Sequence, residues 1–232
     1  MKLKIKLFIF KIQNIIIILK SKRIKKKIKK NFSDKKKIFE KTLLKREFSQ
    51  KWFLNNFEIF HHFFPKDYNK KFEYLEIGSF EGLSTLNVLY NYKNAHVISI
   101  DLWDVPNKNS EALEVDFSEV ERRFDKNLSE FDFLKIKSDS VVSMRQLAKQ
   151  NRKFDIIYID GSHNGEDILS DAIESFKLVN LNGIIILDDI VNINDKIKKQ
   201  SFEGFNSFLK FYKNQIKLIY LSKIAVIKKV DY

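Results

Sequence analysis

Short apolar runs alternate with helix-patterned stretches along most of the chain after Pro65. Compact apolar runs rich in β-branched residues predict strands, whereas apolar residues that recur at three- and four-residue steps predict helices. The expected strands are 72–77, 95–101, 131–137, 154–160 and 183–189, and the expected helices are 83–92, 116–128, 141–150, 168–179 and 196–213. Two last apolar runs are separated only by Ser222 and predict a closing antiparallel pair of strands. This alternation indicates an α/β fold with a mostly parallel sheet and helices on both faces.

The pattern before Pro65 is helical only. Apolar residues between Ile38 and Phe60 recur at three- to five-residue steps, which predicts one or two helices ahead of the main fold. We therefore expect a basic and apolar extension at 1–33, N-terminal helices at 34–69 and a main domain at 70–232.

The charge of the chain is concentrated in its first residues. Of the formal net charge of +13, residues 1–37 carry fifteen Lys and Arg side chains against Asp34 alone, so the rest of the chain is close to neutral. The apolar stretch Leu7–Leu19 is too short for a membrane span, and no small-residue cleavage site follows it. Two interpretations stay open: an amphipathic segment on an anionic membrane surface, or a poorly ordered basic extension.

The chain has no cysteine, which excludes disulfides and thiolate metal sites. A bound metal would need oxygen or imidazole ligands. The composition favours a reducing compartment, so we expect a cytoplasmic protein, with peripheral membrane contact through the first residues as the alternative.

Each of the five expected parallel strands ends at, or leads to, a carboxylate. These are Glu76, Asp101, Asp139 in the turn Ser138–Ser140, Asp160, and the pair Asp188 and Asp189. Ligands of such sheets collect at the carboxyl ends of the strands. The first strand leads into a G-x-x-x-G loop rather than the G-x-G-x-x-G that cradles a pyrophosphate, and an acidic residue ends the second strand. Together these features indicate a nucleoside ligand without a pyrophosphate.

The segments YLEIGSFEGLST, VISIDLW, KSDS and FDIIYIDGSHNGEDILSDAIESFKLVNLNGIIILDD resemble the class I S-adenosylmethionine-dependent methyltransferases, over about residues 70–230. The likeness is to the small-molecule O-methyltransferase branch that includes macrocin-type sugar methyltransferases and cephalosporin-hydroxylase-like relatives. It implies a Rossmann-like sheet of seven strands with the last one antiparallel, and S-adenosylmethionine as cofactor. The resemblance places the cofactor near Glu76, Gly78, Ser79, Gly82, Ser84, Asp101, Leu102, Ser138, Asp139 and Ser140.

The resemblance also implies a divalent cation, with Mg²⁺ as the expected ion and Asp160, Asp188 and Asp189 as its ligands. Methyl transfer to an alcohol requires that the hydroxyl lose its proton as attack develops. Asp160 and His163 are the expected catalytic residues, with His163 as the candidate base. Some sugar-modifying relatives place a carboxylate where this chain has Ser162, so the proton can go to His163 or be shed from a metal-bound hydroxyl.

The expected function is methyl transfer to a hydroxyl of a small molecule, a sugar or glycan precursor. The alternatives are a methyltransferase-like protein with other chemistry, and an RNA methyltransferase that uses the basic tail. The near-neutral body and the absence of an N-P-P-Y-type motif argue against a nucleic-acid substrate. Acceptor contacts are expected from loops 103–118 and 190–200 and from the N-terminal helices, while the acceptor and the oligomeric state stay open.

Overall fold

The computed structural model describes residues 2–104, 116–190 and 196–231. Its centre is a seven-stranded sheet in the order β3-β2-β1-β4-β5-β7-β6. The strands are β1 (Phe72–Ile77), β2 (Ala95–Asp101), β3 (Leu134–Lys137), β4 (Phe154–Ile159), β5 (Val179–Leu187), β6 (Ile216–Leu221) and β7 (Ala225–Lys229). The first five are parallel, and β7 pairs antiparallel with both β5 and β6. The predicted Rossmann-like sheet with an antiparallel end is confirmed.

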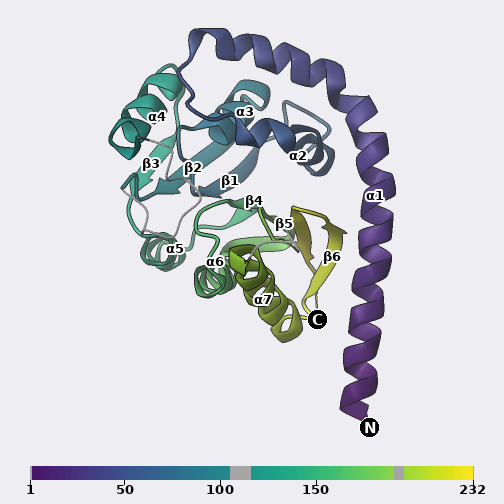
Figure 1. The fold of residues 1–232 in the computed structure, drawn as a ribbon. Coiled ribbons are helices and arrows are strands. Elements are labelled where there is room, and N and C mark those ends of the chain that lie inside the picture. The colour runs from purple at the N-terminus through teal and green to yellow at the C-terminus, as the bar shows by residue number, and fades with distance from the viewer. Residues whose placement is uncertain (1, 105–115, 191–195, 232) are drawn as a thin grey trace.

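Helices cover both faces of this sheet (Figure 1). They are α1 (Lys2–Thr42), α2 (Phe57–Phe63), α3 (Leu83–Asn91), α4 (Val120–Leu128), α5 (Ser140–Lys149), α6 (Gly165–Leu178) and α7 (Lys196–Phe211), with short 3-10 turns at Leu43–Lys45, Trp52–Asn55 and Phe117–Glu119. One hydrophobic core lies between the sheet and α2, α3 and α4, and a second lies between the sheet and α5, α6 and α7. Successive residues of one strand, such as Tyr74 and Leu75, belong to different cores because side chains alternate between the two faces of a sheet.

The strand boundaries differ most from the sequence prediction at the starts of β3 and β5. β3 begins at Leu134 rather than 131, and β5 begins at Val179, directly after α6. The start of β5 pairs with Phe154, after which a register shift separates it from the regular pairing that begins at Ile184. Asn182 in this irregular part has a positive φ of 66°, which explains why the apolar run alone did not reveal the early start.

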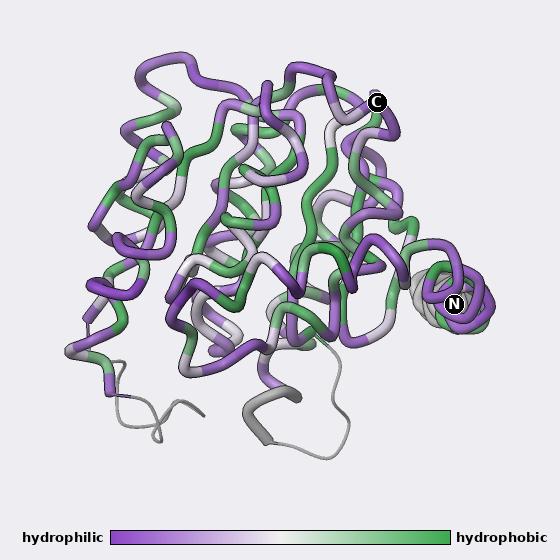
Figure 2. The backbone as a smooth tube through the Cα atoms, turned by 90° about the horizontal axis from the view of Figure 1, so that it is seen from above, coloured by the Kyte–Doolittle hydropathy of each residue, from purple (hydrophilic) through white to green (hydrophobic). Residues whose placement is uncertain are grey.

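The N-terminal extension and the first predicted helix form one continuous element. α1 runs along one side of the domain and then bends over its end, so it crosses position 33 without a break (Figure 1). Figure 2 looks along part of this helix at the edge of the domain, with the apolar strands in the middle. In the part of the chain that the structure describes, no helix is both long and apolar enough to cross a bilayer.

Candidate active site

The carboxyl ends of four neighbouring strands lie side by side. In each of them, the residue that follows the last apolar residue falls in one row across the sheet. The parallel ladder continues one step beyond the strands, because Gly78 N donates to Ile100 O, Asp160 N to Ile77 O and Asp188 N to Ile159 O. The row therefore reads Asp101, Gly78, Asp160, Asp188, in the spatial order β2-β1-β4-β5. Asp101, Asp160 and Asp188 thus lie at one edge of the sheet, the edge formed by the carboxyl ends of the parallel strands.

Glu76 lies two residues before Gly78 on β1 and is completely buried. Its Oε1 accepts hydrogen bonds from Ser84 Oγ at 2.5 Å and Thr85 Oγ1 at 3.1 Å, and its Oε2 accepts from Tyr74 Oη at 2.8 Å. Burial raises the pKa of Glu76 to about 7, although the three hydroxyl donors act in the opposite direction. Ser84, which was predicted at the cofactor, thus holds Glu76 from the first turn of α3.

Gly78 and Gly82 both adopt a left-handed backbone conformation, with φ of 82° and 83°. A Cβ atom on Gly78 would lie 2.3 Å from the carbonyl oxygen of Asp160, so glycine is required where the β1 loop passes the end of β4. A Cβ on Gly161 would make only ordinary contacts, the nearest at 3.6 Å. The sharp turn after Asp160 therefore does not itself require glycine.

Asp101 holds the loop that follows β1. Its Oδ2 accepts from Phe80 N and its Oδ1 accepts from Trp103 N, both at 2.8 Å, and burial raises its pKa. Phe80 has a positive φ of 49°, and its carbonyl oxygen accepts from Trp103 Nε1. A non-glycine residue in this conformation is strained, and here both of its backbone polar groups are fixed.

The remaining residues predicted at the cofactor have different environments. The Ser79 hydroxyl is buried and has no hydrogen-bond partner among the described residues. Asp139 is exposed and caps α5 by accepting from Val142 N at 2.9 Å. Ser140 donates to Asp171 of α6, Leu102 is 56% exposed, and the backbone N–H of Ser138 donates to Asp101 O. Ser79 is thus the one of these side chains whose buried polar atom still lacks a partner.

Asp160 and Asp188 share one phenol. Tyr158 Oη lies 2.7 Å from Asp160 Oδ2 and 3.0 Å from Asp188 Oδ2, and Asn56 Nδ2 donates to the same Asp188 oxygen at 2.5 Å. Burial raises the pKa of Asp160 well above its usual range, and the Asp188 carboxylate adds to this effect. Burial also raises the pKa of Asp188, helped by neighbouring Asp189. Carboxylates placed this closely favour a proton or a cation between them.

Asp189 is oriented toward a different partner. Its Oδ1 lies 2.7 Å from Lys223 Nζ, and its Oδ2 lies 3.6 Å from His163 Nε2. The backbone of Asp189 is left-handed, with φ of 51°, which ends the row. Among the described residues, no three His, Asp or Glu side chains are grouped as metal ligands. The three predicted ligands therefore divide into the pair Asp160 and Asp188, with hard oxygen donors, and Asp189, which faces an ammonium group.

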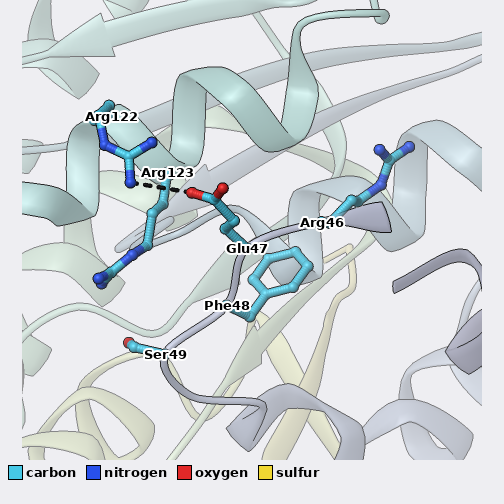
Figure 3. A pocket seen from close by; sticks show the side chains of 6 residues that line it. All are labelled: Arg46, Glu47, Phe48, Ser49, Arg122 and Arg123. Atoms are coloured by element: carbon cyan, nitrogen blue, oxygen red, sulfur yellow. Dashed lines mark hydrogen bonds and ion pairs between the residues drawn. The ribbon is translucent and has the colours of Figure 1, made fainter. Parts of the chain in front are cut away.

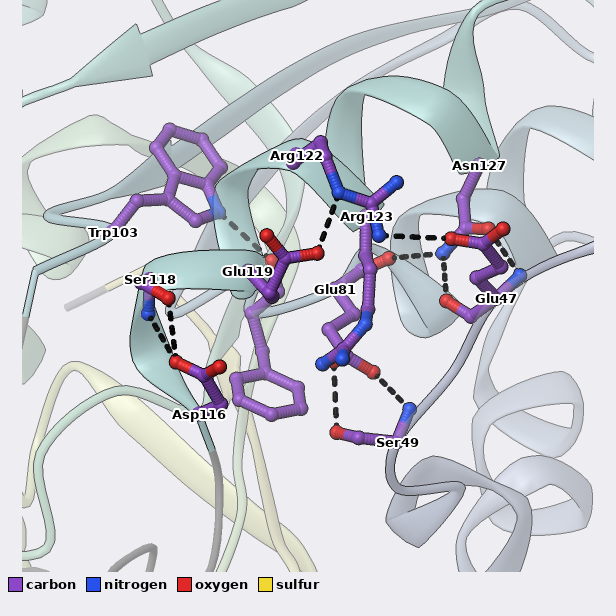
Figure 4. A network of polar contacts seen from close by, with 11 residues as sticks. Glu47, Ser49, Glu81, Trp103, Asp116, Ser118, Glu119, Arg122, Arg123 and Asn127 are labelled. Atoms are coloured by element: carbon purple, nitrogen blue, oxygen red, sulfur yellow. Dashed lines mark hydrogen bonds and ion pairs between the residues drawn. The ribbon is translucent and has the colours of Figure 1, made fainter.

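Another buried carboxylate, Glu81, ties the N-terminal segment to the β1 loop (Figure 4). Glu81 is 1% exposed and accepts from Ser49 N at 2.6 Å, Ser49 Oγ at 2.7 Å and Arg123 at 2.8 Å. Asn127 of α4 donates to the Glu81 carbonyl oxygen and to that of Glu47. The chain between α1 and α2 is thereby anchored over the carboxyl edge of the sheet.

A hollow of about 350 Å³ lies beside this anchor (Figure 3). It is lined by Arg46, Glu47, Phe48, Ser49, Arg122 and Arg123. The arginines are paired with carboxylates, as Arg122 is with Glu47 at 3.0 Å. None of the predicted site residues lines this hollow.

Four residues that contact the predicted site or hold the loop beside it were not predicted from the sequence, namely Tyr158, Asn56, Lys223 and Glu81. A signal for Tyr158 was present, because a strand places residues two apart on the same face. The patterns Tyr74-x-Glu76 and Tyr158-x-Asp160 repeat this arrangement on adjacent strands. Asn56 and Lys223 come from segments far away in the sequence, so only the fold reveals them. The predicted acceptor loops lie partly at 105–115 and 191–195, outside the described residues.

The fold resembles solved methyltransferase structures at low sequence identity. MycE methyltransferase from the mycinamycin biosynthetic pathway, in complex with Mg, SAH and mycinamycin VI, has a TM-score of 0.53 and 16% identity over 79% of this chain. This chain covers 51% of MycE, about half its length. Two further structures, whose names give their activities only as provisional assignments, each have a TM-score of 0.55 to this chain. A Staphylococcus aureus caffeoyl-CoA O-methyltransferase has 14% identity over 92% of this chain, and a Clostridium thermocellum rRNA-methylase has 13% over 79%; this chain covers all of each. No curated protein matches the chain.

The match to a family model is direct evidence at the level of sequence. The model of the methyltransferase domain matches residues 75–190, which is half of the chain. This region includes Glu76, Gly78, Asp101, Asp160 and Asp188, which together form the edge of the sheet described above. The chain therefore belongs to the methyltransferase domain family and has the fold of its class I, S-adenosylmethionine-dependent members.

Proposed function

We propose that the protein transfers a methyl group from S-adenosylmethionine to a hydroxyl oxygen of a small molecule, a sugar or a glycan precursor, with the help of a divalent cation. The observation that carries the proposal is the buried pair Asp160 and Asp188 around Tyr158, next to the glycine loop in the row of strand ends. A hydroxyl acceptor must lose its proton during methyl transfer, and this pair of carboxylates is the proposed group that takes it up.

The cofactor is proposed to lie over the β1 loop. Asp101, at the end of β2, would accept from the ribose hydroxyls, and the unpartnered Ser79 hydroxyl would bond to the ligand. Gly78 lets the loop after β1 pass directly against the backbone of Asp160, and buried Glu76 adds a negative charge next to this loop once it ionises. A sulfonium carries a positive charge, so this electrostatic environment suits it.

The donor chemistry of Asp160 and Asp188 fits a hard cation such as Mg²⁺ in part. Both offer carboxylate oxygens, and Asp189 would join them by leaving Lys223. A bound cation would lower the pKa of an acceptor hydroxyl. MycE, which was solved with Mg and SAH, has a similar fold. His163, 3.6 Å from Asp189, is the proposed alternative base, and its imidazole is a quarter exposed.

Calorimetry with S-adenosylmethionine tests the cofactor part of the proposal. The Asp101→Ala variant should bind the cofactor at least roughly tenfold more weakly, because one charge-assisted hydrogen bond contributes about 1.5–3 kcal/mol. The matched control is Asp132→Ala, which removes an exposed carboxylate. Equal affinity in both variants, or no binding by the native chain, would contradict the cofactor assignment.

The acceptor class is tested by methyl transfer from labelled S-adenosylmethionine to sugars, sugar nucleotides and catechols, with total RNA as a competing acceptor. We expect label in a hydroxyl-bearing small molecule, lost on chelation and restored by Mg²⁺. Label that survives chelation would contradict the cation. Label in RNA alone would favour an RNA methyltransferase.

A further inference from the structure

We propose that the outer face of α1 binds an anionic lipid membrane. This surface, the basic face, comprises the exposed residues Lys20, Lys22, Arg23, Lys26, Lys27, Lys29 and Lys30 together with Ile16 and Leu19. The proposal concerns a binding surface apart from the methyl-transfer site.

The basic face is the outward side of a helix whose inward side is fixed to the domain. Ile28 is 1% exposed, and Ser21, equally buried, accepts a hydrogen bond from Leu221 N of β6 at 2.9 Å. Ile17 packs against one hydrophobic core and Ile24 against the other. These inward residues follow one another at three- and four-residue steps, so they form a single stripe of the helix. The orientation of α1 over this stretch is therefore set by packing.

The opposite side of the helix carries only positive charge over this stretch. In the part of the chain that the structure describes, none of the seven cations of the basic face is paired with a carboxylate. The next acidic residue along the helix is Asp34, which lies 3.6 Å from Lys37. On α4 and β3, by contrast, acidic residues lie among the cations, and Lys135 pairs with both Glu121 and Asp125. An array of like charges without partners favours an anionic surface as its ligand.

Apolar side chains on the same face distinguish a membrane from a nucleic acid. Ile16 and Leu19 are 45% and 57% exposed. With a helical repeat of about 3.6 residues, they lie in line with Arg23, Lys26 and Lys30. Phosphate backbones are bound by cations and other hydrogen-bond donors, whereas a lipid interface also takes up exposed apolar side chains. The sequence of residues 2–15 continues the same composition, with lysines, apolar residues and no acidic residue.

The rest of the chain is nearly neutral, so only α1 and the residues next to it are attracted to an anionic membrane. The body beyond residue 37 has 28 basic and 29 acidic side chains, so it is not attracted to an anionic surface. Each Lys or Arg near such a surface contributes roughly a fivefold increase in partitioning, and salt screens this attraction. Binding through α1 would therefore hold the methyltransferase domain at the membrane by one edge.

Flotation of the full chain with vesicles tests the proposal. Vesicles of phosphatidylcholine alone are compared with vesicles that also contain phosphatidylglycerol, at low and high salt. A variant with the seven cations of the basic face changed to Gln should lose at least roughly a hundredfold in partitioning to the anionic vesicles. The matched control changes seven exposed lysines elsewhere to Gln, namely Lys70, Lys71, Lys93, Lys149, Lys210, Lys213 and Lys217, and should bind as the native chain does.

A second variant separates lipid from nucleic acid. Ile16→Ser with Leu19→Ser should weaken binding to the anionic vesicles several-fold and leave binding to a random RNA unchanged. Circular dichroism of each variant should show native helix content. Equal loss in the basic-face and control variants, equal binding to neutral vesicles, or binding to RNA without binding to vesicles would each overturn the proposal.

Discussion

The buried carboxyl of Glu76 should make the stability of the protein depend on pH. Glu76 is 0% exposed, and burial raises its pKa from 4.5 to about 7. The folded state therefore binds a proton more tightly than the unfolded state does. The resulting contribution to stability is fully present below about pH 4.5 and is lost as the pH rises through about 7.

The magnitude follows from the two pKa values. One pH unit corresponds to about 1.36 kcal/mol, so the complete loss is about 3 kcal/mol, of which about 2.5 kcal/mol falls between about pH 5 and about pH 8. In Glu76→Gln this part of the pH dependence should vanish. The amide oxygen can still accept from Ser84 and Thr85, and the amide nitrogen can donate to Tyr74 Oη.

Urea unfolding of the native chain and of Glu76→Gln at about pH 5 and about pH 8 measures how much free energy of unfolding each protein loses between the two pH values. The native chain should lose about 2.5 kcal/mol more than Glu76→Gln between the two conditions. The matched control, Glu203→Gln, removes an exposed carboxylate and should keep the native slope. If Glu76→Gln also keeps that slope, burial does not perturb this carboxyl and the reasoning is refuted.

Four further substitutions test the contacts at the edge of the sheet, each by urea unfolding. Gly78→Ala should destabilise the protein by more than about 2 kcal/mol and Gly161→Ala by less than about 1 kcal/mol, because only the first Cβ meets a backbone oxygen; equal effects would contradict the close approach. Asn56→Ala should cost about 1–3 kcal/mol by removing a donor from buried Asp188, and no change would show that the contact is absent. Glu81→Leu should cost at least about 3 kcal/mol, since it strands a paired guanidinium and a backbone donor, whereas a neutral result would show that the anchor of the N-terminal segment contributes nothing.

Local pattern was sufficient to predict the row of strand ends. Each of β1, β2 and β4 is a compact apolar run, and the parallel arrangement brings the residues that follow to a common edge. Asp101, Asp160 and Asp188 could therefore be placed from sequence alone. Their position requires only the direction of each strand and the residue at which it ends.

The partners of these carboxylates could not be predicted in the same way. Asn56 reaches Asp188 from a segment 132 residues earlier, and Lys223 reaches Asp189 from the turn between β6 and β7. The roles of Ser138 and Asp139, in the turn after β3, are hard to predict for a different reason. The same residue types that contact a ligand also cap helices, and Asp139 does cap α5. Sequence gives the position of such a residue but not the direction of its side chain.

The shared phenol limits the charge states that the pair Asp160 and Asp188 can adopt. Tyr158 has one hydroxyl proton and two carboxylate oxygens within 3.0 Å, so it can donate to only one of them. The second contact needs a proton on a carboxyl or a cation between the two groups, in line with the raised pKa of Asp160.

These two alternatives predict opposite results when Mg²⁺ is added to the protein in weakly buffered solution near neutral pH. If the cation replaces a carboxyl proton, binding of Mg²⁺ should release up to about one proton per chain. The Asp188→Asn variant should abolish this proton release. Binding of Mg²⁺ without proton release would show that the pair is already ionised.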